Sequence, residues 1–284
     1  MQFNIIGAGR LGKNIGLVLV SSGLAELQAV CNKNFHSAQL AVEQMGAGVA
    51  VKTLADLPPV DLTFITTADD MIADIAQQLT EQGQLRKEAL IVHCSGSLSS
   101  IVLAPLKTRG SILASIHPLK AFRADHLDKL SFMGCPCIFE GEERALNQLA
   151  PLFKQLGTQL TPIKAENKTT YHAAAVIASN YLVTLAATAV DLFVEAGINN
   201  ELAQHMATGL MASSLDNLQQ ANTVAKALTG PLARGDLNTI SNHLQALHNP
   251  TTKTLYQAAA LATLPITSLS EEKKKALETL LRND

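Results

Sequence analysis

Residues 3–16, FNIIGAGRLGKNIG, place three glycines in a G-x-G-x-x-G pattern between an apolar run and a helical pattern. In such a unit the first glycine makes a tight turn, the second lets backbone amides approach a pyrophosphate, and the third lets the helix pack closely on the strand. The helix N-terminus then faces the anion. A glycine-rich turn without a ligand is the alternative, which this context disfavours. We therefore predict a dinucleotide-binding turn with cofactor contacts from Gly7, Ala8, Gly9, Arg10, Leu11 and Gly12.

Short apolar runs continue to alternate with helical patterns through about residue 160. Strands are expected at ELQAVC, GVAVK, DLTFIT, ALIVHCSG, SILASIHP, CPCIFEG and QLTPIK, and helices at about 11–22, 37–45, 70–82 and 142–156. This alternation predicts βαβ units and a mostly parallel, doubly wound sheet. We assign residues 1–163 to an α/β Rossmann domain.

The pattern changes from about Ala165, where β-rich runs give way to helical stretches rich in alanine and leucine. An all-α domain is expected over residues 164–284, with helices at 168–195, 199–220, 222–229, 236–248 and 250–263 and a charged helix at the end, capped by Ser268 or Ser270. Its longest apolar run, AAAVIASNYLVTLAATAV at residues 173–190, approaches the length of a membrane span. Because polar residues interrupt this run and basic flanks are missing, we interpret it as the centre of a helical domain or as a subunit interface.

Composition narrows the class of protein. A formal net charge of -2 with 16% charged residues gives no electrostatic case for binding nucleic acid or an anionic membrane. The four cysteines are scattered, and the C-P-C spacing of Cys135 and Cys137 fits neither a redox pair nor a zinc knuckle. We expect no metal site and buried thiols in a reducing cytosol. The first strand starts almost at Met1, so no signal peptide is expected and a cytoplasmic location is predicted.

The end of the second strand, QAVCNKNF, bears on the choice between NAD and NADP. About 20 residues beyond the glycines an NAD site usually carries an acid that accepts hydrogen bonds from the adenosine ribose. Here the candidates are Asn32, Lys33 and Asn34, so no carboxylate would repel a 2'-phosphate. Lys33 or Arg10 could pair with that phosphate, although Lys33 could also be an ordinary surface lysine. We predict NADP, with NAD as the less favoured cofactor, and include Asn32 and Lys33 among the cofactor contacts.

Ligands of open α/β sheets bind beside the carboxyl ends of the strands. Thr66, Thr67 and Ala68 follow one strand and Cys94, Ser95 and Gly96 follow the next, and both groups are expected to pass close to the cofactor. Ser95 and Gly96 are also expected to contact substrate. Asp69 and Asp70 are expected to cap the following helix. His117 ends a strand at the same edge in SIHPLKAF, and it either terminates that strand or contacts substrate.

The stretch NKTTYHAAAVIASNYL, residues 167–182, sets polar side chains in an otherwise apolar helix. At about 100° per residue, Lys168, His172 and Ser179 share one stripe and Asn180 lies on its flank. Burying such groups without partners costs on the order of 1–3 kcal/mol each, so they either satisfy one another or face a polar ligand. This helix follows a dinucleotide domain, which favours the second alternative. We predict His172, Lys168 and Asn180 as catalytic residues, with Tyr171 and Ser179 as weaker candidates.

A second polar cluster is LTGPLARGDLNTISNHL, residues 228–244. A helix stop at Gly230-Pro231 followed by a helix capped by Asp236 would account for part of it. Arg234 is not needed for that, and arginine is well suited to bind a carboxylate through its bidentate fork. We predict Arg234 and Asp236 as substrate-binding residues, the alternative being a surface salt bridge between them.

Five stretches carry a resemblance to a known family: GAGRLG, IVHCSGSLS, IHPLKAF, YHAAAVIASNYL and LTGPLARGD with NHLQAL. In this order they resemble the largely uncharacterised bacterial Rossmann-like oxidoreductases whose C-terminal helical domain carries a domain-of-unknown-function label. The resemblance spans about residues 4–247. More distantly, the layout is similar to pyrroline-5-carboxylate reductases and to the 3-hydroxyisobutyrate and 6-phosphogluconate dehydrogenases.

The distant relatives imply roles for particular residues. The two dehydrogenases carry a lysine and, four residues later, an asparagine at the start of the first helix after the Rossmann domain. Lys168 matches the lysine, whereas the second position is the titratable His172. In the reductases the loop that matches TGPLARGD helps to bind the substrate carboxylate and lies in a helical domain that dimerises. The resemblance implies a homodimer formed through the helical domain.

These observations predict an NADP-dependent oxidoreductase that transfers hydride to or from a small carbonyl, imine or hydroxy acid bearing a carboxylate. Histidine has an ordinary pKa of about 6.5, which suits proton transfer in both directions near neutral pH, so His172 is the expected proton donor or acceptor. Lys168 would polarise the substrate or act as the acid, and Arg234 would anchor its carboxylate. The alternative is a non-catalytic NADP(H)-binding sensor or interaction protein.

Overall fold

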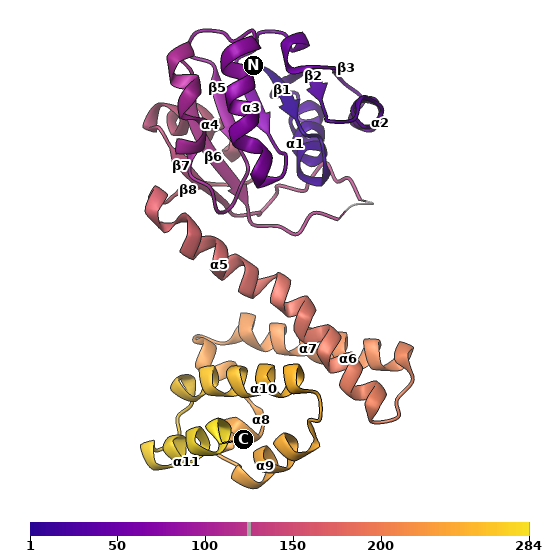
Figure 1. Cartoon of the computed structure of the whole chain (residues 1–284), viewed down its shortest axis with the longest axis vertical. Helices are drawn as coiled ribbons and strands as arrows, with labels where there is room; N and C mark the ends of the chain where they lie inside the picture. The colour runs from indigo at the N-terminus through magenta and orange to yellow at the C-terminus, as the bar shows by residue number, and fades with distance from the viewer. Residues whose placement is uncertain (124–125, 284) are drawn as a thin grey trace. The chain divides into compact units, whose positions relative to one another are not determined.

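The computed structural model describes residues 1–123 and 126–283. The described chain forms two compact units, one of residues 1–179 and one that begins at Asn180 (Figure 1).

The first unit is built on a mostly parallel sheet, as the sequence predicts. Its strands in the described chain are β1 Gln2–Ile6, β2 Glu26–Cys31, β3 Val49–Val51, β4 Leu62–Ile65, β5 Leu90–His93, β6 Ile112–Pro118, β7 Cys137–Gly141 and β8 Leu160–Pro162. They pair in the order β3-β2-β1-β4-β5-β6-β7-β8. Neighbouring strands run parallel except β6 and β7, which are antiparallel. The order reverses direction between β1 and β4, which is the topological switch point where ligands of such sheets bind.

Helices cover both faces of this sheet, so the domain is doubly wound. Its helices are α1 Arg10–Ser21, α2 Phe35–Met45, α3 Asp69–Gln82, α4 Glu143–Gln155 and α5 Lys168–Ala178, with the 3-10 helices η1 Leu54–Asp56, η2 Ser100–Arg109 and η3 Ala165–Asn167. Side chains of α1, α2 and α4 pack in one apolar cluster, and those of α3 and η2 pack in another.

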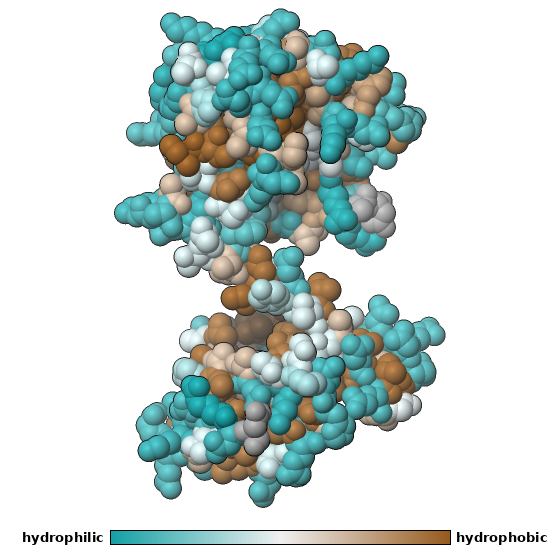
Figure 2. Space-filling model, viewed as in Figure 1, coloured by the Kyte–Doolittle hydropathy of each residue, from teal (hydrophilic) through white to brown (hydrophobic). Residues whose placement is uncertain are grey.

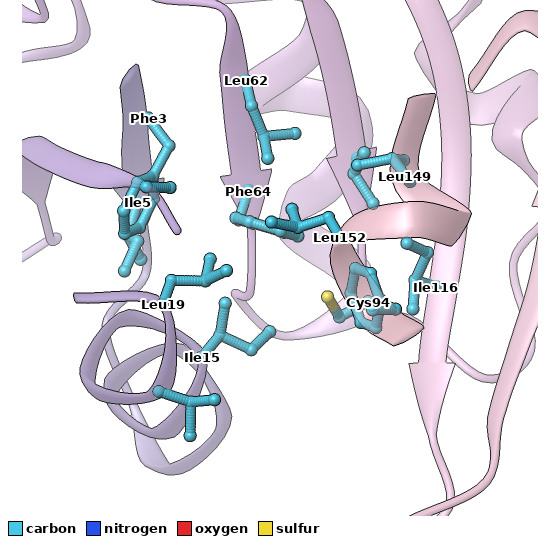
Figure 3. Packing of buried hydrophobic residues seen from close by; sticks show 14 of the residues in the cluster. Phe3, Ile5, Ile15, Leu19, Leu62, Phe64, Cys94, Ile116, Leu149 and Leu152 are labelled. Carbon is cyan, nitrogen blue, oxygen red and sulfur yellow. The ribbon is translucent and has the colours of Figure 1, made fainter. Parts of the chain in front are cut away.

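The strands divide their side chains between these two clusters because successive residues of a strand point to opposite faces. In β1, Phe3 and Ile5 join the cluster of α1, whereas Ile6 joins that of α3. Figure 3 shows Phe3 and Ile5 beside Ile15 of α1 on the first of these faces. Burial on both faces explains why the strands read as continuous apolar runs in the sequence.

One element of the first unit was not expected from the sequence. Residues 100–109 form η2, although the 3-10 helix contains Pro105 and shows no amphipathic pattern of the usual period. Leu103 and Leu106 of η2 are buried against the α3 face. Packing against the sheet, rather than helical propensity, therefore holds this segment.

The first unit also includes α5. The sequence analysis put the domain boundary at residues 163 and 164, whereas the compact units divide between Ser179 and Asn180. The expected helix over residues 168–195 is interrupted at Ser179, which has φ -120° and ψ -68° and separates α5 from α6. Residues 168–178 thus belong with the sheet that they follow.

The second unit is helical, as expected. Its helices in the described chain are α6 Asn180–Glu195, α7 Asn200–Gln220, α8 Gly230–Arg234, α9 Leu237–Ala246, α10 Pro250–Thr263 and α11 Glu271–Arg282, with the 3-10 helices η4 Val224–Ala227 and η5 Leu264–Ile266. Side chains of α9, α10 and α11 form its buried core. Ser270 caps α11 by accepting a hydrogen bond from the Lys273 backbone, which confirms one of the two predicted caps.

Two expectations for the second unit were wrong. The helix expected over residues 222–229 is only the short η4, because this segment places no residue in the core. Gly230 and Pro231 begin α8 instead of ending a helix, with Pro231 in the first turn, where its missing N–H costs nothing.

Apolar side chains remain at the surface of the helical unit, as Figure 2 shows. None of the α6 residues is buried, and Val183 and Leu210 are 70% and 66% exposed. By length and composition, the helical stretch Ala165–Glu195 could cross a membrane, because an 18-residue window within it has a mean hydropathy of 1.7. The core helix of a soluble domain can meet the same criteria, but such a helix is mostly buried, whereas none of this window is buried in the described chain. Near the start of the stretch, Lys168 is buried against the first unit. The interpretation as a domain centre or subunit interface stays a prediction.

Candidate functional site

The glycine turn has the geometry that its sequence predicts. Gly7 adopts φ +87°, and a Cβ there would lie 2.4 Å from Thr67 Cγ2. A Cβ on Gly12 would lie 2.4 Å from Thr66 Oγ1, so α1 could not approach β4 with a larger residue. At Gly9 the nearest atom to an added Cβ is the Gly7 oxygen at 3.9 Å, which leaves open space at the N-terminus of α1. The turn therefore combines a tight fold with room for an anion.

A cavity of about 800 Å³ lies beside this turn. The predicted cofactor contacts that line it are Gly7, Ala8, Gly9, Asn32, Lys33, Thr66, Thr67 and Ala68. Arg10, Leu11 and Gly12 are not among its lining residues, and Gly12 instead shapes the turn through its contact with Thr66. The sequence analysis missed Ser37, Lys52 and Thr53. Lys52 directly follows β3, and ligands of such sheets bind at the carboxyl ends of the strands. Its position in the sequence could therefore have identified it as a cofactor contact.

Asn32 stands where an NAD site usually carries an acid. Its Oδ1 accepts a hydrogen bond of 2.7 Å from the Ala8 backbone, and its Nδ2 donates one of 3.0 Å to Ser37 Oγ. Among the described residues that line the cavity none is Asp or Glu, whereas Lys33 and Lys52 are both present. The Lys52 ammonium lies 5.6 Å from the centre of the Phe35 ring. This end of the cavity therefore favours a negatively charged group.

Asp69 connects the start of α3, beside the cavity, with the turn that follows β5. The expected cap at the start of α3 was wrong, because Ala68 is the N-cap residue and neither Asp69 nor Asp70 caps through its side chain. Both acids lie in the first turn, where negative charge is stabilised by the helix dipole. Asp69 Oδ2 accepts hydrogen bonds from Ser95 Oγ at 2.7 Å and Ser97 Oγ at 2.9 Å. The turn after β5 is thus hydrogen-bonded to Asp69, which directly follows Ala68 of the cofactor cavity.

Ser95 supports this turn from within. The residue is buried, and its Oγ accepts hydrogen bonds from the Ser97 and Leu98 backbones while donating to Asp69. Its carbonyl oxygen accepts from Lys168 Nζ at 2.9 Å and from Ser115 Oγ at 3.3 Å. Ser95 was predicted to contact substrate, and in the structure its polar atoms hold the backbone around Gly96.

Lys168 is 1% exposed, an unusual environment for a lysine. Its ammonium donates to the Ser95 carbonyl and to Ser115 Oγ. Burial lowers the pKa of Lys168 to about 8, against the opposing effect of the negative charges of Glu140 and Asp69. The lysine remains mostly charged at neutral pH and is already bonded to two protein oxygens.

Two imidazoles meet above Gly96. The ring centres of His117 and His172 lie 5.6 Å apart at an interplanar angle of 80°. A Cβ on Gly96 would lie 2.4 Å from His172 Nδ1 and 3.0 Å from His117 Cε1. His172 Nδ1 is buried against this glycine with no hydrogen-bond partner among the described residues. The glycine therefore permits an approach that any larger residue would block.

Tyr171 completes this group. Its hydroxyl lies 2.6 Å from His117 Nδ1. Burial lowers the pKa of His117 to about 4, with further effects from His172 and Lys168, while burial raises the pKa of Tyr171 to about 12. Both side chains are neutral near pH 7, and the hydrogen bond fixes the orientation of the His117 ring.

The other predicted site residues lie in the second unit. Asn180 begins α6 and is exposed, and Arg234 is the exposed last residue of α8. Asp236 caps α9, as expected, by accepting hydrogen bonds from the Thr239 backbone and hydroxyl at 3.1 Å and 2.7 Å. The Thr239 bonds and the Arg234 charge lower the pKa of Asp236. Within the described residues no ion pair joins Arg234 to Asp236.

Comparisons with known proteins support the fold assignment. A Rossmann-like domain model matches residues 1–118, and the model of a domain of unknown function, DUF2520, matches residues 135–263. The chain therefore consists of a Rossmann-like domain followed by a DUF2520 domain, in agreement with the resemblance seen in the sequence. Among curated proteins none matches the chain.

Solved structures with the same fold include three that extend over nearly the whole chain. A Bacteroides fragilis protein, described provisionally as an NADP oxidoreductase, is 23% identical with a TM-score of 0.76 over 92% of this chain and 96% of its own. A Thermotoga maritima protein is 25% identical with a TM-score of 0.68 over 99% and 100%. A Plasmodium falciparum pyrroline carboxylate reductase with NADP bound is 12% identical with a TM-score of 0.60 over 98% of each chain.

Proposed function

We propose that this protein is an NADP-dependent oxidoreductase that transfers hydride to or from a small carbonyl, imine or hydroxy acid bearing a carboxylate. The observation that carries the proposal is the contact of His117 and His172 with Gly96. Through Ser95, the same turn is hydrogen-bonded to Asp69, the neighbour of Ala68 in the cofactor cavity. Hydrogen bonds through Ser95 and Asp69 therefore link the turn below the two histidines to the residue next to the cavity in which the side chains fit a dinucleotide.

The cofactor choice rests on the charge of the cavity. Lys33 and Lys52 line it together with Ser37, and the Asn32 amide occupies the usual place of the acid that binds an NAD ribose. A 2'-phosphate would gain two nearby cations and a hydroxyl donor there. NADH has no 2'-phosphate, so it would gain neither of these charge interactions. We therefore propose NADP as the preferred cofactor and NAD as a weaker ligand.

His172 is the proposed proton-transfer residue. Its Nδ1 is buried against Gly96, which leaves Nε2 as the nitrogen that a substrate can reach. Bound NADPH would supply the hydride, and His172 in its protonated form would give the proton on Nε2 to the substrate oxygen or nitrogen and become neutral, so that a carbonyl becomes an alcohol or an imine becomes an amine. In the reverse direction neutral His172 accepts the proton as the hydride leaves the substrate carbon.

His117 has a different proposed role. Tyr171 stays protonated at neutral pH and can donate to His117 Nδ1, which leaves the His117 proton on Nε2. The neutral ring is then a fixed hydrogen-bond donor that orients the substrate oxygen or nitrogen. Its lowered pKa keeps it from competing with His172 for the transferred proton.

Arg234 remains our proposal for binding the substrate carboxylate, because a guanidinium forms two parallel hydrogen bonds to a carboxylate. We propose Asn180 and Asp236 as further substrate-positioning residues. The exposed apolar side chains of α6 and α7 support our proposal of a homodimer formed through the helical unit. A cytoplasmic location remains a proposal from the sequence.

The decisive experiment separates binding from turnover. NADPH and NADH are titrated by their fluorescence, and NADPH oxidation is then measured with keto acids, cyclic imines and aldehydes. We expect His172→Ala to lower turnover by about 100-fold or more while leaving NADPH affinity unchanged. Equal loss of both would identify His172 as a structural residue. Tight NADPH binding with no turnover across the panel would favour the alternative, a non-catalytic NADP(H) sensor.

A further inference from the structure

The ammonium of Lys168 bridges two different parts of the sheet edge. Lys168 begins α5, and its two acceptors are the Ser95 carbonyl in the turn after β5 and the Ser115 hydroxyl in β6. The Ser95 carbonyl also accepts a hydrogen bond from Ser115 Oγ. Three segments that are distant in sequence therefore meet at one buried nitrogen.

Each acceptor lies next to a residue of the imidazole group. Ser95 precedes Gly96, the residue against which both histidines lie. Ser115 stands two residues before His117 in β6, so their side chains share one face of the strand. His172 lies one helical turn after Lys168 in α5 and therefore on the same side of that helix. From the helix that carries His172, the ammonium thus contacts the residue before Gly96 and a residue two positions before His117.

The distance between the turn at Gly96 and the His172 ring can change little. An added Cβ on Gly96 would come within 2.4 Å of His172 Nδ1, so the turn and the ring are already in close contact. Lys168 as a whole is 1% exposed, so it offers substrate almost no surface. Its position suits a group that fixes other groups rather than one that reacts.

We propose that Lys168 is a positioning residue, whose ammonium joins the turn after β5 to β6 and thereby sets how His117 and His172 lie against Gly96. This proposal rests on the proposed oxidoreductase function for its kinetic consequence, but not for its structural one. It differs from the role expected from the sequence, in which Lys168 polarises the substrate or acts as the acid.

The variants Lys168→Met and Ser115→Ala test this role. Lys168→Met keeps a long side chain but removes the charge and the donors. Ser115→Ala removes one acceptor of the ammonium together with the Ser115 donor to the Ser95 carbonyl. Both variants can fold, because the Ser95 carbonyl retains the Ser115 hydroxyl as a donor in the first and Lys168 in the second. Lys164→Met is the matched control, since Lys164 is 78% exposed and pairs only at 3.8 Å with Glu166.

The first readout needs no substrate. Imidazole resonances of isotope-labelled histidines are followed by NMR as pH is varied. In Lys168→Met we expect the His117 and His172 signals to move and the pKa of His117 to rise, because the cationic Lys168 disfavours its protonation. The other groups that act on His117 are His172, Asp69 and Tyr171, which the variant leaves in place. Unchanged imidazole signals in Lys168→Met and Ser115→Ala would overturn the proposal.

The second readout is kinetic. A displacement of catalytic groups by about 1 Å can cost about 100-fold in rate, so Lys168→Met should lower kcat by roughly 10–100-fold. Ser115→Ala should lower kcat by a smaller factor. Both variants should bind NADPH with wild-type affinity, and Lys164→Met should have wild-type kcat. Loss of turnover in Lys168→Met with wild-type behaviour of Ser115→Ala would instead identify Lys168 as the acid. If the wild type turns over no substrate, the proposed function fails, and the NMR readout still decides the role of Lys168.

Discussion

Replacing Gly96 with alanine tests the contact on which the proposed chemistry depends. The added Cβ would lie 2.4 Å from His172 Nδ1 and 3.0 Å from His117 Cε1. Ordinary contacts to a Cβ begin near 3.4 Å, so His172 must move by 3.4 − 2.4 = 1.0 Å and His117 by 3.4 − 3.0 = 0.4 Å. Gly96 is not one of the described glycines that have a positive φ. The substitution therefore acts through this contact and not through backbone strain.

The expected result follows from the size of that displacement. A misplacement of about 1 Å in a catalytic group can lower the rate by about 100-fold, and overpacking a buried site costs about 1–3 kcal/mol of stability. We expect kcat/KM of Gly96→Ala to fall by about 100-fold. The affinity for NADPH should be unchanged, because Gly96 is not among the residues that line the cofactor cavity.

The assay is NADPH oxidation with the best substrate of the panel, alongside NADPH titration and thermal unfolding. Gly209→Ala is the matched control, because a Cβ there meets no atom within 4 Å and α7 gains a better helix former. Wild-type turnover in Gly96→Ala would refute the reasoning, because it would mean that catalysis does not depend on the observed positions of the His117 and His172 rings.

Three further predictions concern the cofactor, pH and assembly. Lys52→Ala should weaken NADPH binding by about tenfold, since loss of one phosphate contact costs about 1–2 kcal/mol of binding free energy, and should leave NADH binding nearly unchanged. Equal weakening of NADPH and NADH binding in fluorescence titrations would contradict a contact between Lys52 and the 2'-phosphate. Burial lowers the pKa of His93 and His117 to about 4, so the unfolded chain binds more protons than the folded chain between about pH 6.5 and 4. The free energy of unfolding should therefore fall as the pH is lowered through this window, by up to about 1.4 kcal/mol per pH unit for each histidine. His93→Gln should reduce the slope measured by denaturant titration. Val183→Asp, at a site 70% exposed in α6, should shift a dimer to monomer in light scattering, whereas a charge at exposed Ile101 of η2 should not.

The glycine turn could be predicted from the sequence because its constraints are local. The spacing of the three glycines and the positive φ of Gly7 belong to one strand–turn–helix unit, whereas the close contacts of Gly7 and Gly12 with Thr67 and Thr66 come from the end of β4. The position of Lys52 in the same cavity was missed, because it depends on how β3 is placed beside β2.

Asp69 and Lys168 show where local reasoning fails. An acid at the start of a helix usually caps it, yet Asp69 bonds Ser95 and Ser97 of the next strand end. A lysine on a polar helical stripe suggested access to substrate, yet Lys168 is buried on two protein oxygens. Both outcomes depend on partners that are 26 or more residues away along the chain.

The sequence by itself determined the alternation of strands and helices, the dinucleotide turn and the change to a helical second half, because apolar periodicity and glycine geometry act over a few residues. Only the tertiary structure brought Gly96, His117 and His172 together and gave α5 to the first unit. The physical reason is that sheet order decides which strand ends are neighbours, and burial then requires each polar group there to find a partner. For Lys168 that partner was the protein itself.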